Sequence, residues 1–175
     1  MGASKPEEYG DYYAWGETET KDKYDEFNYK WRKGDGYSKY ITNELSGENK
    51  TTLDPEDDVA HVKWGGSWRM PTKAELDELV TSCTWTWTSL IGVEGCRITS
   101  DKKGYTDRSI FLPASFSALF GLGYYGVYRC NSLSSNSCTW CIDFGHTTSD
   151  EEYFEVNLLD VWKRYSGFSV RPVCP

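Results

Sequence analysis

Three cysteines and one histidine in the last third of the chain are the residues whose types and spacing could do chemistry. Cys138 and Cys141 form a Cys-x-x-Cys pair, with Cys130 before it and His146 after it. Thiolate and imidazole groups bind zinc, but a zinc knuckle needs four ligands at tight spacing. Cys130 lies far from the pair along the chain. We therefore favour a disulfide, or thiols without a metal, over a zinc site, and we expect no metal and no cofactor.

The sequence around this cysteine pair also argues against redox chemistry. A redox Cys-x-x-Cys motif usually opens a helix, whereas this pair flanks Trp140, which alternates with Ile142 and Phe144 as in a strand. The chain has six cysteines, at 83, 96, 130, 138, 141 and 174. An even number suggests disulfides in an exported protein, but the sequence does not choose among the pairings.

A second group with chemical potential is the acidic run that follows Asp54-Pro55. Its spacing does not match a calcium-binding EF-hand loop. Helix capping explains it better, because Asp54 is a good N-cap, Pro55 suits the first helical position and acids favour the start of a helix. We therefore predict a short helix here. Its buried side is expected to be formed by Val59, Ala60 and Val62.

The motifs of common enzymes and of calcium-dependent lectins are missing. The sequence contains no glycine-rich phosphate loop, no Ser-His-Asp order and no HExxH motif. The Glu-Pro-Asn and Trp-Asn-Asp motifs of sugar-binding lectins are also absent. We therefore expect a protein that is not an enzyme.

The segment 64–72 organises the elements that must position these residues. It places two Trp around a glycine pair and then starts a helix, with Thr72 as N-cap and Glu75 as its capping-box partner. Trp68 beside Arg69 suggests a buried indole with a stacked or hydrogen-bonded guanidinium. The apolar side of the helix is expected to be formed by Leu76, Leu79 and Val80.

The remainder of the chain predicts short strands and long loops. Residues 84–88 alternate Thr with Trp, 96–99 and 109–112 continue a meander after a turn at 92–95, and 12–17 and 167–173 read as outer strands. Residues 18–50 read as a long loop pinned by Trp31, Tyr37 and Tyr40, and 149–163 show poor periodicity. With 16% aromatic residues and 16 Gly in 175 residues, we predict one α+β domain over 1–175, with two short helices, short twisted antiparallel sheets and long loops.

Charge and hydropathy exclude two classes of partner. The formal net charge is −8, and nucleic acid binding needs basic surface to neutralise phosphates. No run of apolar residues is long enough to span a bilayer, so we expect no membrane insertion. The first six residues have no apolar signal core, so an export signal would lie outside this chain.

Four segments, in order, resemble the major paralogous domain first described from Fibrobacter succinogenes, which is abundant in gut Bacteroidetes. They are 12–17 (YYAWGE), 64–72 (WGGSWRMPT), 111–114 (FLPA) and 169–173 (SVRPV). The resemblance covers essentially the whole chain. It implies a C-type lectin fold of the formylglycine-generating-enzyme-like branch. It also implies an earlier first strand, carrying Trp-Ala-x-Cys and pairing with the C-terminal strand, which is absent here.

The late part of the chain departs from that family. Where the family often reads Tyr-Trp-Ser-Ser-Ser, residues 128–132 read YRCNS, and all of 125–166 is irregular between ordinary flanks. This pattern resembles the variable proteins of diversity-generating retroelements. In those proteins a hypervariable segment before a fixed closing strand forms an exposed ligand-binding face. The Tyr, Trp, Ser and Asn content of 125–166 is also typical of binding loops.

We therefore predict a hypervariable face that binds an unknown protein or glycan on a cell surface. The protein would be extracellular, on a cell surface or a phage tail fibre, and attached to a larger fibre or pilus. Two alternatives remain: a surface structural or adhesin domain without diversification, and a cysteine oxidase of the formylglycine-generating type using Cys130 with Cys138 or Cys141. The predicted ligand-binding residues are Tyr125, Val127, Tyr128, Ser134, Asn136, Cys138, Cys141, Asp143, Asp160, Trp162, Lys163 and Ser166.

Overall fold

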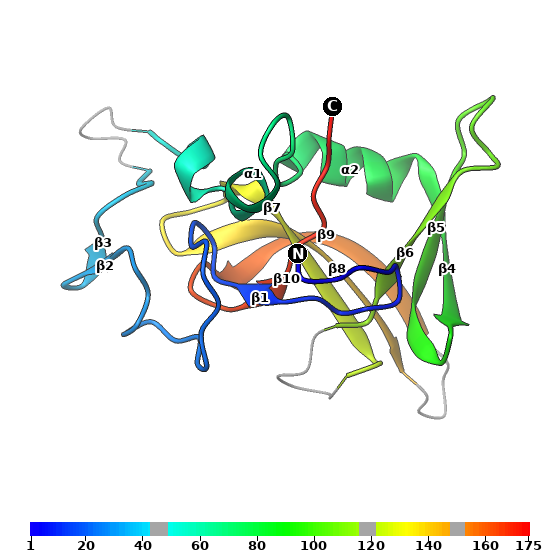
Figure 1. The fold of residues 1–175 in the computed structure, drawn as a ribbon, viewed down its shortest axis with the longest axis horizontal. Coiled ribbons are helices and arrows are strands. Elements are labelled where there is room, and N and C mark those ends of the chain that lie inside the picture. The colour runs from blue at the N-terminus through cyan, green and yellow to red at the C-terminus, as the bar shows by residue number, and fades with distance from the viewer. Residues whose placement is uncertain (43–48, 116–121, 148–152) are drawn as a thin grey trace.

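The computed structural model describes residues 1–42, 49–115, 122–147 and 153–175, without the side chains of 147, 153 and 159–161. Within these residues the fold is α+β, with two α-helices and several short antiparallel sheets (Figure 1). A three-stranded sheet β4-β5-β6 and a three-stranded sheet β7-β8-β9 form the body. Among the described residues, no helix has the length and apolar character needed to cross a membrane.

The two ends of the chain lie side by side. Strand β1 (Tyr12–Tyr13) pairs with β10 (Phe168–Ser169), and the amino group of Met1 donates to the Val170 carbonyl at 2.7 Å (Figure 1). An isolated bridge joins Arg69 to Val173. Both outer strands are therefore shorter than the predicted spans 12–17 and 167–173, because only two residues of each form a ladder.

The described residues between 14 and 53 form a long excursion held by aromatic packing, as predicted for 18–50. Its only regular structure in the described residues is the hairpin of β2 (Arg32–Lys33) and β3 (Gly36–Tyr37). Tyr40 is buried, with its ring 5.1 Å from Trp15 and 6.0 Å from Trp31, both edge-on. Together with Leu53, Val59 and Met70 they make one hydrophobic core cluster.

The acidic run folds differently from the prediction. A 3-10 turn η1 (Pro55–Asp57) comes first, and helix α1 (Val59–Trp64) begins only after Asp58. The carboxylate of Asp58 caps α1 by accepting from the backbone of Ala60 and His61, and it also accepts from Met70 N at 2.9 Å. Asp54 makes no capping bond to η1. The predicted start at Pro55 with Asp54 in the N-cap position is therefore present as a 3-10 turn, but the side chain that caps the α-helix is that of Asp58.

Two burial predictions near α1, those for Val62 and Trp68, were also wrong. Val59 and Ala60 are buried, but Val62 is 46% exposed, because the helix is too short to present a second apolar turn to the core. Trp64 is equally exposed and meets the half-buried Trp68 edge-on at 4.7 Å. The guanidinium of Arg69 donates two 2.8 Å hydrogen bonds to the carboxylate of Glu75.

Helix α2 (Lys73–Thr81) starts as predicted. Thr72 Oγ1 accepts from Glu75 N at 3.2 Å, and the Glu75 carboxylate accepts from Thr72 N at 2.7 Å, which completes the capping box. Leu76 is buried, and Leu79 and Val80 pack partly against the same core. The helix lies across the top of both large sheets (Figure 1).

The meander was predicted with small boundary errors. It consists of β4 (Cys83–Leu90), β5 (Val93–Ser100) and β6 (Ser109–Pro113). The turn is Ile91-Gly92 rather than 92–95, and both residues have positive φ, 52° and 79°. Two residues with positive φ match the twist of a two-residue hairpin, so β5 begins directly afterwards.

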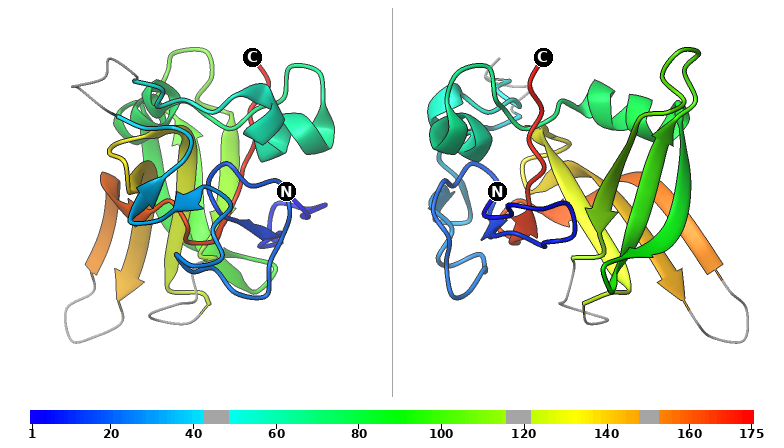
Figure 2. Two further views of the ribbon diagram at one scale, coloured as in Figure 1. Left: turned by 90° about the vertical axis from the view of Figure 1, so that its left-hand side faces the viewer. Right: turned by 45° about the vertical axis from the view of Figure 1, so that its right-hand side comes forward.

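The last sheet contains β7 (Tyr125–Leu133), β8 (Cys138–Thr147) and β9 (Tyr153–Lys163), all antiparallel. The prediction of poor periodicity over 149–163 missed β9. A register shift between Thr139 and Cys141 interrupts the alternation that a regular strand would show. The two large sheets pack against each other, with the ring of Trp87 on β4 6.1 Å from that of Phe154 on β9, and α2 lies above both sheets (Figure 2).

Candidate functional site

The sheet β7-β8-β9 has two faces that differ in chemistry. The inner face carries Tyr128, Ile142 and Phe144, which pack with Leu76 and the β4-β5-β6 sheet. We call the opposite side the outer face. Ladder partners share a face, so it includes the pairs Val127 with Asp143, Arg129 with Cys141, and Asp143 with Asn157.

Asp143 lies at the centre of the outer face. It is only 1% exposed, and the burial of its charge raises the pKa of its carboxyl. Polar groups of Tyr125, Trp162 and Asn157 act against that shift, and the indole of Trp162 donates to Oδ2 at 3.4 Å. The other oxygen, Oδ1, has no hydrogen-bond partner among the described residues. A buried carboxylate oxygen without a partner is costly, so the packing around Asp143 leaves one polar atom of this face unsatisfied.

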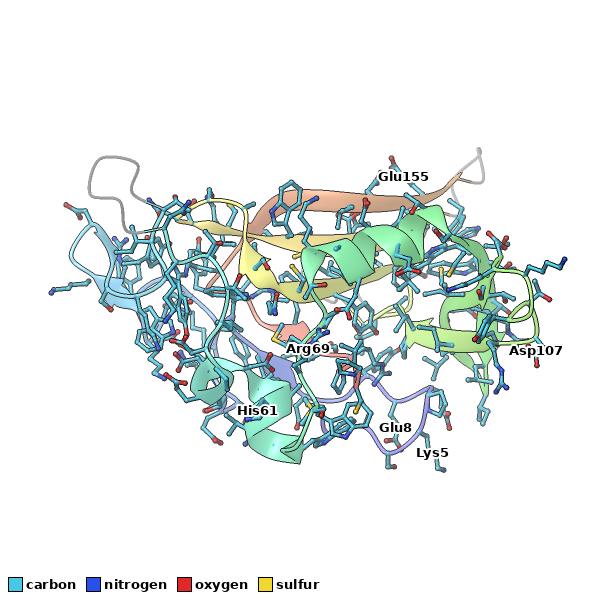
Figure 3. The ribbon with its side chains drawn as sticks, turned by 90° about the horizontal axis from the view of Figure 1, so that it is seen from above. Lys5, Glu8, His61, Arg69, Asp107 and Glu155 are labelled. Carbon is cyan, nitrogen blue, oxygen red and sulfur yellow. The ribbon has the colours of Figure 1, made fainter. Side chains whose placement is uncertain are left out.

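The rim around Asp143 is partly open. Tyr125, Asn157 and Trp162 are half-buried, and Glu155 is exposed. Glu155 projects from β9 away from the body of the molecule (Figure 3). Burial and the nearby Asp143 charge raise the pKa of Tyr125, so it stays a neutral phenol. The rim offers two aromatic rings, an amide and the exposed carboxyl of Glu155, which suits binding a polar or cationic group.

A buried arginine, Arg129, closes the upper part of the outer face. Its guanidinium donates to the carbonyls of Lys163 at 3.2 Å and Arg164 at 3.3 Å, and lies 4.3 Å above the ring of Phe168. Burial lowers the pKa of Arg129 and raises the pKa of the neighbouring Cys141 thiol. These contacts tie the end of β9 to β7, so this half of the face is structural.

A second buried arginine, Arg164, attaches the long excursion to the sheet. It donates to Tyr29 Oη and Tyr40 O, both at 2.9 Å, and to Lys39 O at 3.0 Å. Its guanidinium also lies 4.5 Å from the Tyr37 ring centroid. Burial of these two arginines was not predicted from the sequence. Their partners are backbone carbonyls that lie far away along the chain.

The structure divides the predicted ligand-binding residues into three groups. Five of them share the outer face: Tyr125, Val127, Cys141, Asp143 and Trp162. Five lie at the end of the sheet beside the long excursion: Ser134, Asn136, Cys138, Lys163 and Ser166. Tyr128 is on the inner face, and the side chain of Asp160 lies outside the described residues.

Several of these residues cannot belong to an exposed face. Val127, Tyr128, Cys141 and Asp143 are all buried, because 125–133 and 138–147 are strands of a packed sheet rather than loops. Tyr128 stacks on Phe144 and donates to the Pro113 carbonyl at 2.8 Å. The prediction that these four present themselves to a ligand was therefore wrong.

The group at the end of the sheet is held by the long excursion. Asn136 is exposed, but its side chain accepts from Thr42 Oγ1 at 2.9 Å and donates to Thr42 O at 3.1 Å. Its carbonyl accepts from Arg164 at 3.2 Å. Lys163 is exposed on the last residue of β9, and Ser166 is half-buried in the turn that follows. This end therefore contributes structure first and surface second.

The cysteine and histidine alternatives lose their geometric basis. No disulfide joins the six cysteines. Burial raises the pKa of Cys130 to about 11. Cys130 lies in the inner core cluster and Cys141 in the outer one, while the ring of His146 stacks on Trp87 at 5.1 Å. Within the described residues these side chains do not form a metal-binding cluster.

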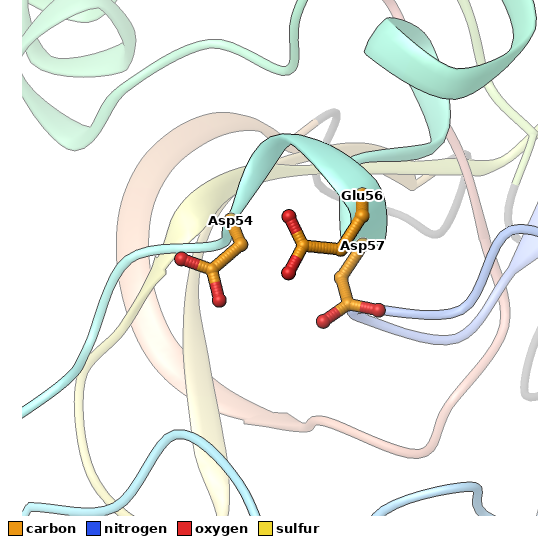
Figure 4. Close-up of side chains that lie close together, drawn as sticks. All are labelled: Asp54, Glu56 and Asp57. Carbon is orange, nitrogen blue, oxygen red and sulfur yellow. The ribbon is translucent and has the colours of Figure 1, made fainter.

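The acidic run does bring carboxylates together, at Asp54, Glu56 and Asp57 (Figure 4). Lys39 lies against all three, with its Nζ 3.0, 3.5 and 2.6 Å from their oxygens. Burial alone would lower the pKa of Lys39, but its bonds to Asp57 and Asp54 outweigh that and raise it. A lysine ammonium therefore fills the position a cation would take.

Comparison with known proteins finds no matching family, no matching curated protein and no matching solved structure. The function must therefore be argued from the site itself.

Proposed function

We propose that the chain is a ligand-binding domain without enzymatic activity, and that it presents the rim of the outer face to a protein or glycan ligand. The observation that carries the proposal is the unequal use of the two faces of β7-β8-β9. The inner face forms the core, while the outer face keeps half-exposed Tyr125, Asn157 and Trp162 around a buried carboxylate. Tyr and Trp give contact area at low entropy cost, and fixed polar groups orient a ligand.

We propose further that the scaffold is a C-type lectin-like fold of the major paralogous domain. The antiparallel pairing of the first strand with the closing strand supports this, as do two helices followed by a meander and a longer sheet. The four resembling segments occupy structural positions. They form β1 and its turn, the lead into α2, the end of β6, and β10 with its bridge to Arg69.

On this scaffold, the proposed role is that of a variable protein of a diversity-generating retroelement. It would be displayed extracellularly on a cell surface, pilus or phage tail fibre. Strands whose inner face is packed and whose outer rim is partly open allow rim residues to change without unfolding. That division is what a hypervariable segment requires.

Sequencing of the native locus tests the diversification step. We expect a near-copy of the codons for about 50 residues, 123–173, beside a reverse transcriptase gene, differing only at adenines and mainly at rim positions. A locus without such a copy would contradict diversification. The domain would then be a surface adhesin with a fixed binding face.

A copper experiment tests the enzyme alternative. A cysteine oxidase of the formylglycine-generating type would bind copper through a reactive cysteine pair. Here Cys130 and Cys141 lie in different core clusters, and burial raises the pKa of both thiols. We expect purified protein to take up no copper(I) beyond that taken up by a Cys130→Ser variant. Stoichiometric uptake that this variant loses would contradict the proposal.

A further inference from the structure

A groove on the far side of the molecule from the outer face carries a second inference. It has a volume of about 610 Å³ and lies between the N-terminal segment, the C-terminal end and the sheet β4-β5-β6. It is open along its length and separate from the residues around Asp143. The residues that line it are Ala3, Ser4, Lys5, Pro6, Leu90, Arg97, Ser109, Ile110, Phe111, Leu112, Arg171 and Pro172.

Four consecutive residues of β6 line this groove, so it follows the edge of that strand. β6 is the last strand of its sheet and pairs only with β5. At the two ends of the ladder, Ser100 N donates to Arg108 O and Ala114 N donates to Glu94 O. Hydrogen-bonded pairs alternate in an antiparallel ladder. Ile110 and Leu112 are therefore the β6 residues that bond to β5.

By the same alternation, Ser109 and Phe111 direct their backbone N–H and C=O groups away from β5. In the described part of the chain no strand or loop bonds to these groups. Native proteins usually cover or charge such an edge, because it is a template for another strand. Here the edge borders a groove instead.

The groove is positively charged in an acidic protein. Its lining includes Lys5, Arg97 and Arg171 and no carboxylate. None of the three cations forms an ion pair within the described residues. Arg171 uses its guanidinium to bind the carbonyls of Pro6 at 3.1 Å and Glu8 at 2.8 Å, which holds the N-terminal wall in place.

The nearest acids in sequence are already engaged. Glu8 accepts from Ser4 N at 2.6 Å, and Asp107 lies 3.7 Å from Arg108. Figure 3 shows Lys5 and Glu8 on the N-terminal segment and Asp107 at the far end of the β5–β6 hairpin. The charge of Glu8 therefore offsets part of that of Lys5, and Arg97 and Arg171 supply the rest of the positive charge of the groove.

The groove also offers apolar contacts at strand spacing. Ile110 is 51% exposed although it is a large apolar residue, and Leu90 of β4 also lines the groove. Side chains of an extended peptide alternate in direction, so one set can meet apolar surface while the other meets the cations. A small anion would use the arginines but would leave the strand edge unsatisfied.

We propose that this groove binds an extended, acidic peptide segment of a partner protein, which adds to β6 as a fourth strand. Backbone groups of Ser109 and Phe111 provide the pairing, and Lys5, Arg97 and Arg171 select acidic side chains. A second copy of this chain is a poorer occupant, because edge-to-edge pairing would bring the same three cations together from both sides. The inference does not depend on the proposed ligand face, which belongs to the other sheet.

The probe is a fluorescein-labelled synthetic peptide of about seven residues that alternates glutamate with valine. One matched peptide carries lysine in place of glutamate, and another has a central proline that removes a backbone donor. Fluorescence anisotropy on the full chain should show binding of the glutamate peptide at least about tenfold tighter than either control.

Two pairs of variants separate charge from strand pairing. Arg97→Glu should weaken binding about tenfold, while the same charge change at the exposed Lys103, outside the groove, should change it less than about twofold. Ser109→Pro removes one outward N–H at the first residue of β6, where proline is tolerated. It should weaken binding clearly more than Ser109→Ala does.

Hydrogen exchange on the unmodified protein gives a readout that does not rely on a variant folding. Saturating glutamate peptide should slow exchange at the amides of Ser109 and Phe111, while those of Ile110 and Leu112 are protected already. Three results would overturn the proposal: no binding, equal binding of the lysine peptide, or binding without protection at Ser109 and Phe111. Self-association that Arg97→Glu abolishes would also overturn it, by assigning the groove to a second copy.

Discussion

The two faces of the β7-β8-β9 sheet are built from the same strands but solve different problems. On the inner face Phe144 is fully buried, stacks on Tyr128 at 6.1 Å and lies 5.5 Å from Trp85. On the outer face the same depth of burial holds Arg129 and Asp143, and each has a polar atom without a partner among the described residues. The inner face is fixed by shape, whereas the outer face keeps polar groups whose partners are incomplete.

This difference shows that the outer face is less favourable to the stability of the fold than the inner face. A core without function has no reason to bury an unpartnered carboxylate oxygen, because an apolar residue of similar size would cost less. Local rules are broken mainly at functional or strained positions. The difference between the two faces therefore supports the proposal that the outer face is the binding side.

The largest effect is expected from emptying the inner face. Phe144→Ala should lower the free energy of unfolding by about 3–5 kcal/mol, because the ring is fully buried among aromatic neighbours. Urea denaturation followed by tryptophan fluorescence measures this. The matched control is Phe27→Ala at an 89% exposed ring, which should change stability by less than about 0.5 kcal/mol. Equal losses would remove the distinction between core and surface.

The two buried arginines should differ in how much each contributes to the free energy of unfolding. Arg164→Met should cost about 3 kcal/mol, because it leaves buried carbonyls of Tyr40 and Lys39 without their donor. Arg129→Met should cost about 1 kcal/mol or less, because its bonds are longer and its Nε is already unpartnered. Urea denaturation of the two variants measures this difference. A larger loss for Arg129 would contradict the view that Arg164 is the stronger anchor of the two.

Most substitutions in a core lower the stability of the protein, but Asp143→Asn should raise it at neutral pH. The folded pKa of Asp143 is raised above its ordinary 3.8, so its protonated form favours folding. Its contribution is present below the unfolded pKa and is lost as pH rises through the folded pKa. The variant should therefore be more stable relative to the wild type at about pH 7 than at about pH 3. A stability difference that does not change with pH would show that Asp143 titrates normally.

A small stability effect is also expected at the cap of α2, the helix that packs on the inner face. Thr72→Ala should cost about 1 kcal/mol, because the Glu75 amide loses its acceptor. Thr81→Ala, on the last turn of the same helix, removes only a bond to the Asp77 carbonyl and should be nearly neutral. Thermal unfolding by circular dichroism compares them, and equal shifts would argue against the capping box.

The pH dependence of this cap has the opposite sign to that of Asp143. The Arg69 guanidinium lowers the pKa of Glu75 to about 2. Its contribution is present above the ordinary pKa of 4.5 and is lost as pH falls toward 2. Both groups of the pair are partly exposed, so the effect is reduced by solvent and salt.

Short-range signals in the sequence predicted much of the framework. The capping box at Thr72, the Thr and Trp alternation of β4 and the alternation of Trp140 with Ile142 each reflect contacts within a few residues. The ligand-binding role of the segment 125–166 stays a prediction. The predictions that failed depended on contacts between residues far apart in the sequence. β9 was missed at a register shift, and the N-cap moved to Asp58 because that carboxylate also accepts from Met70, twelve residues away.

Burial of charge was the other failure. Arg164 is buried because residues from 29 to 40 fold over it, and nothing within its own strand signals that. Likewise, Val127 and Tyr128 are adjacent in sequence but lie on opposite faces of the sheet, so composition alone placed both at the ligand. The strand register, rather than residue type, separates the rim from the core.

A paired library tests the central claim most directly. One library randomises the rim codons for Tyr125, Glu155, Asn157 and Trp162, and the other randomises the inner codons for Tyr128, Cys130, Ile142 and Phe144. Both are displayed on yeast and challenged with protease, which measures the folded fraction. We predict that most rim variants resist proteolysis and that most inner variants do not. Equal loss of resistance in the two libraries would show that the outer face is part of the core and would contradict a variable binding face.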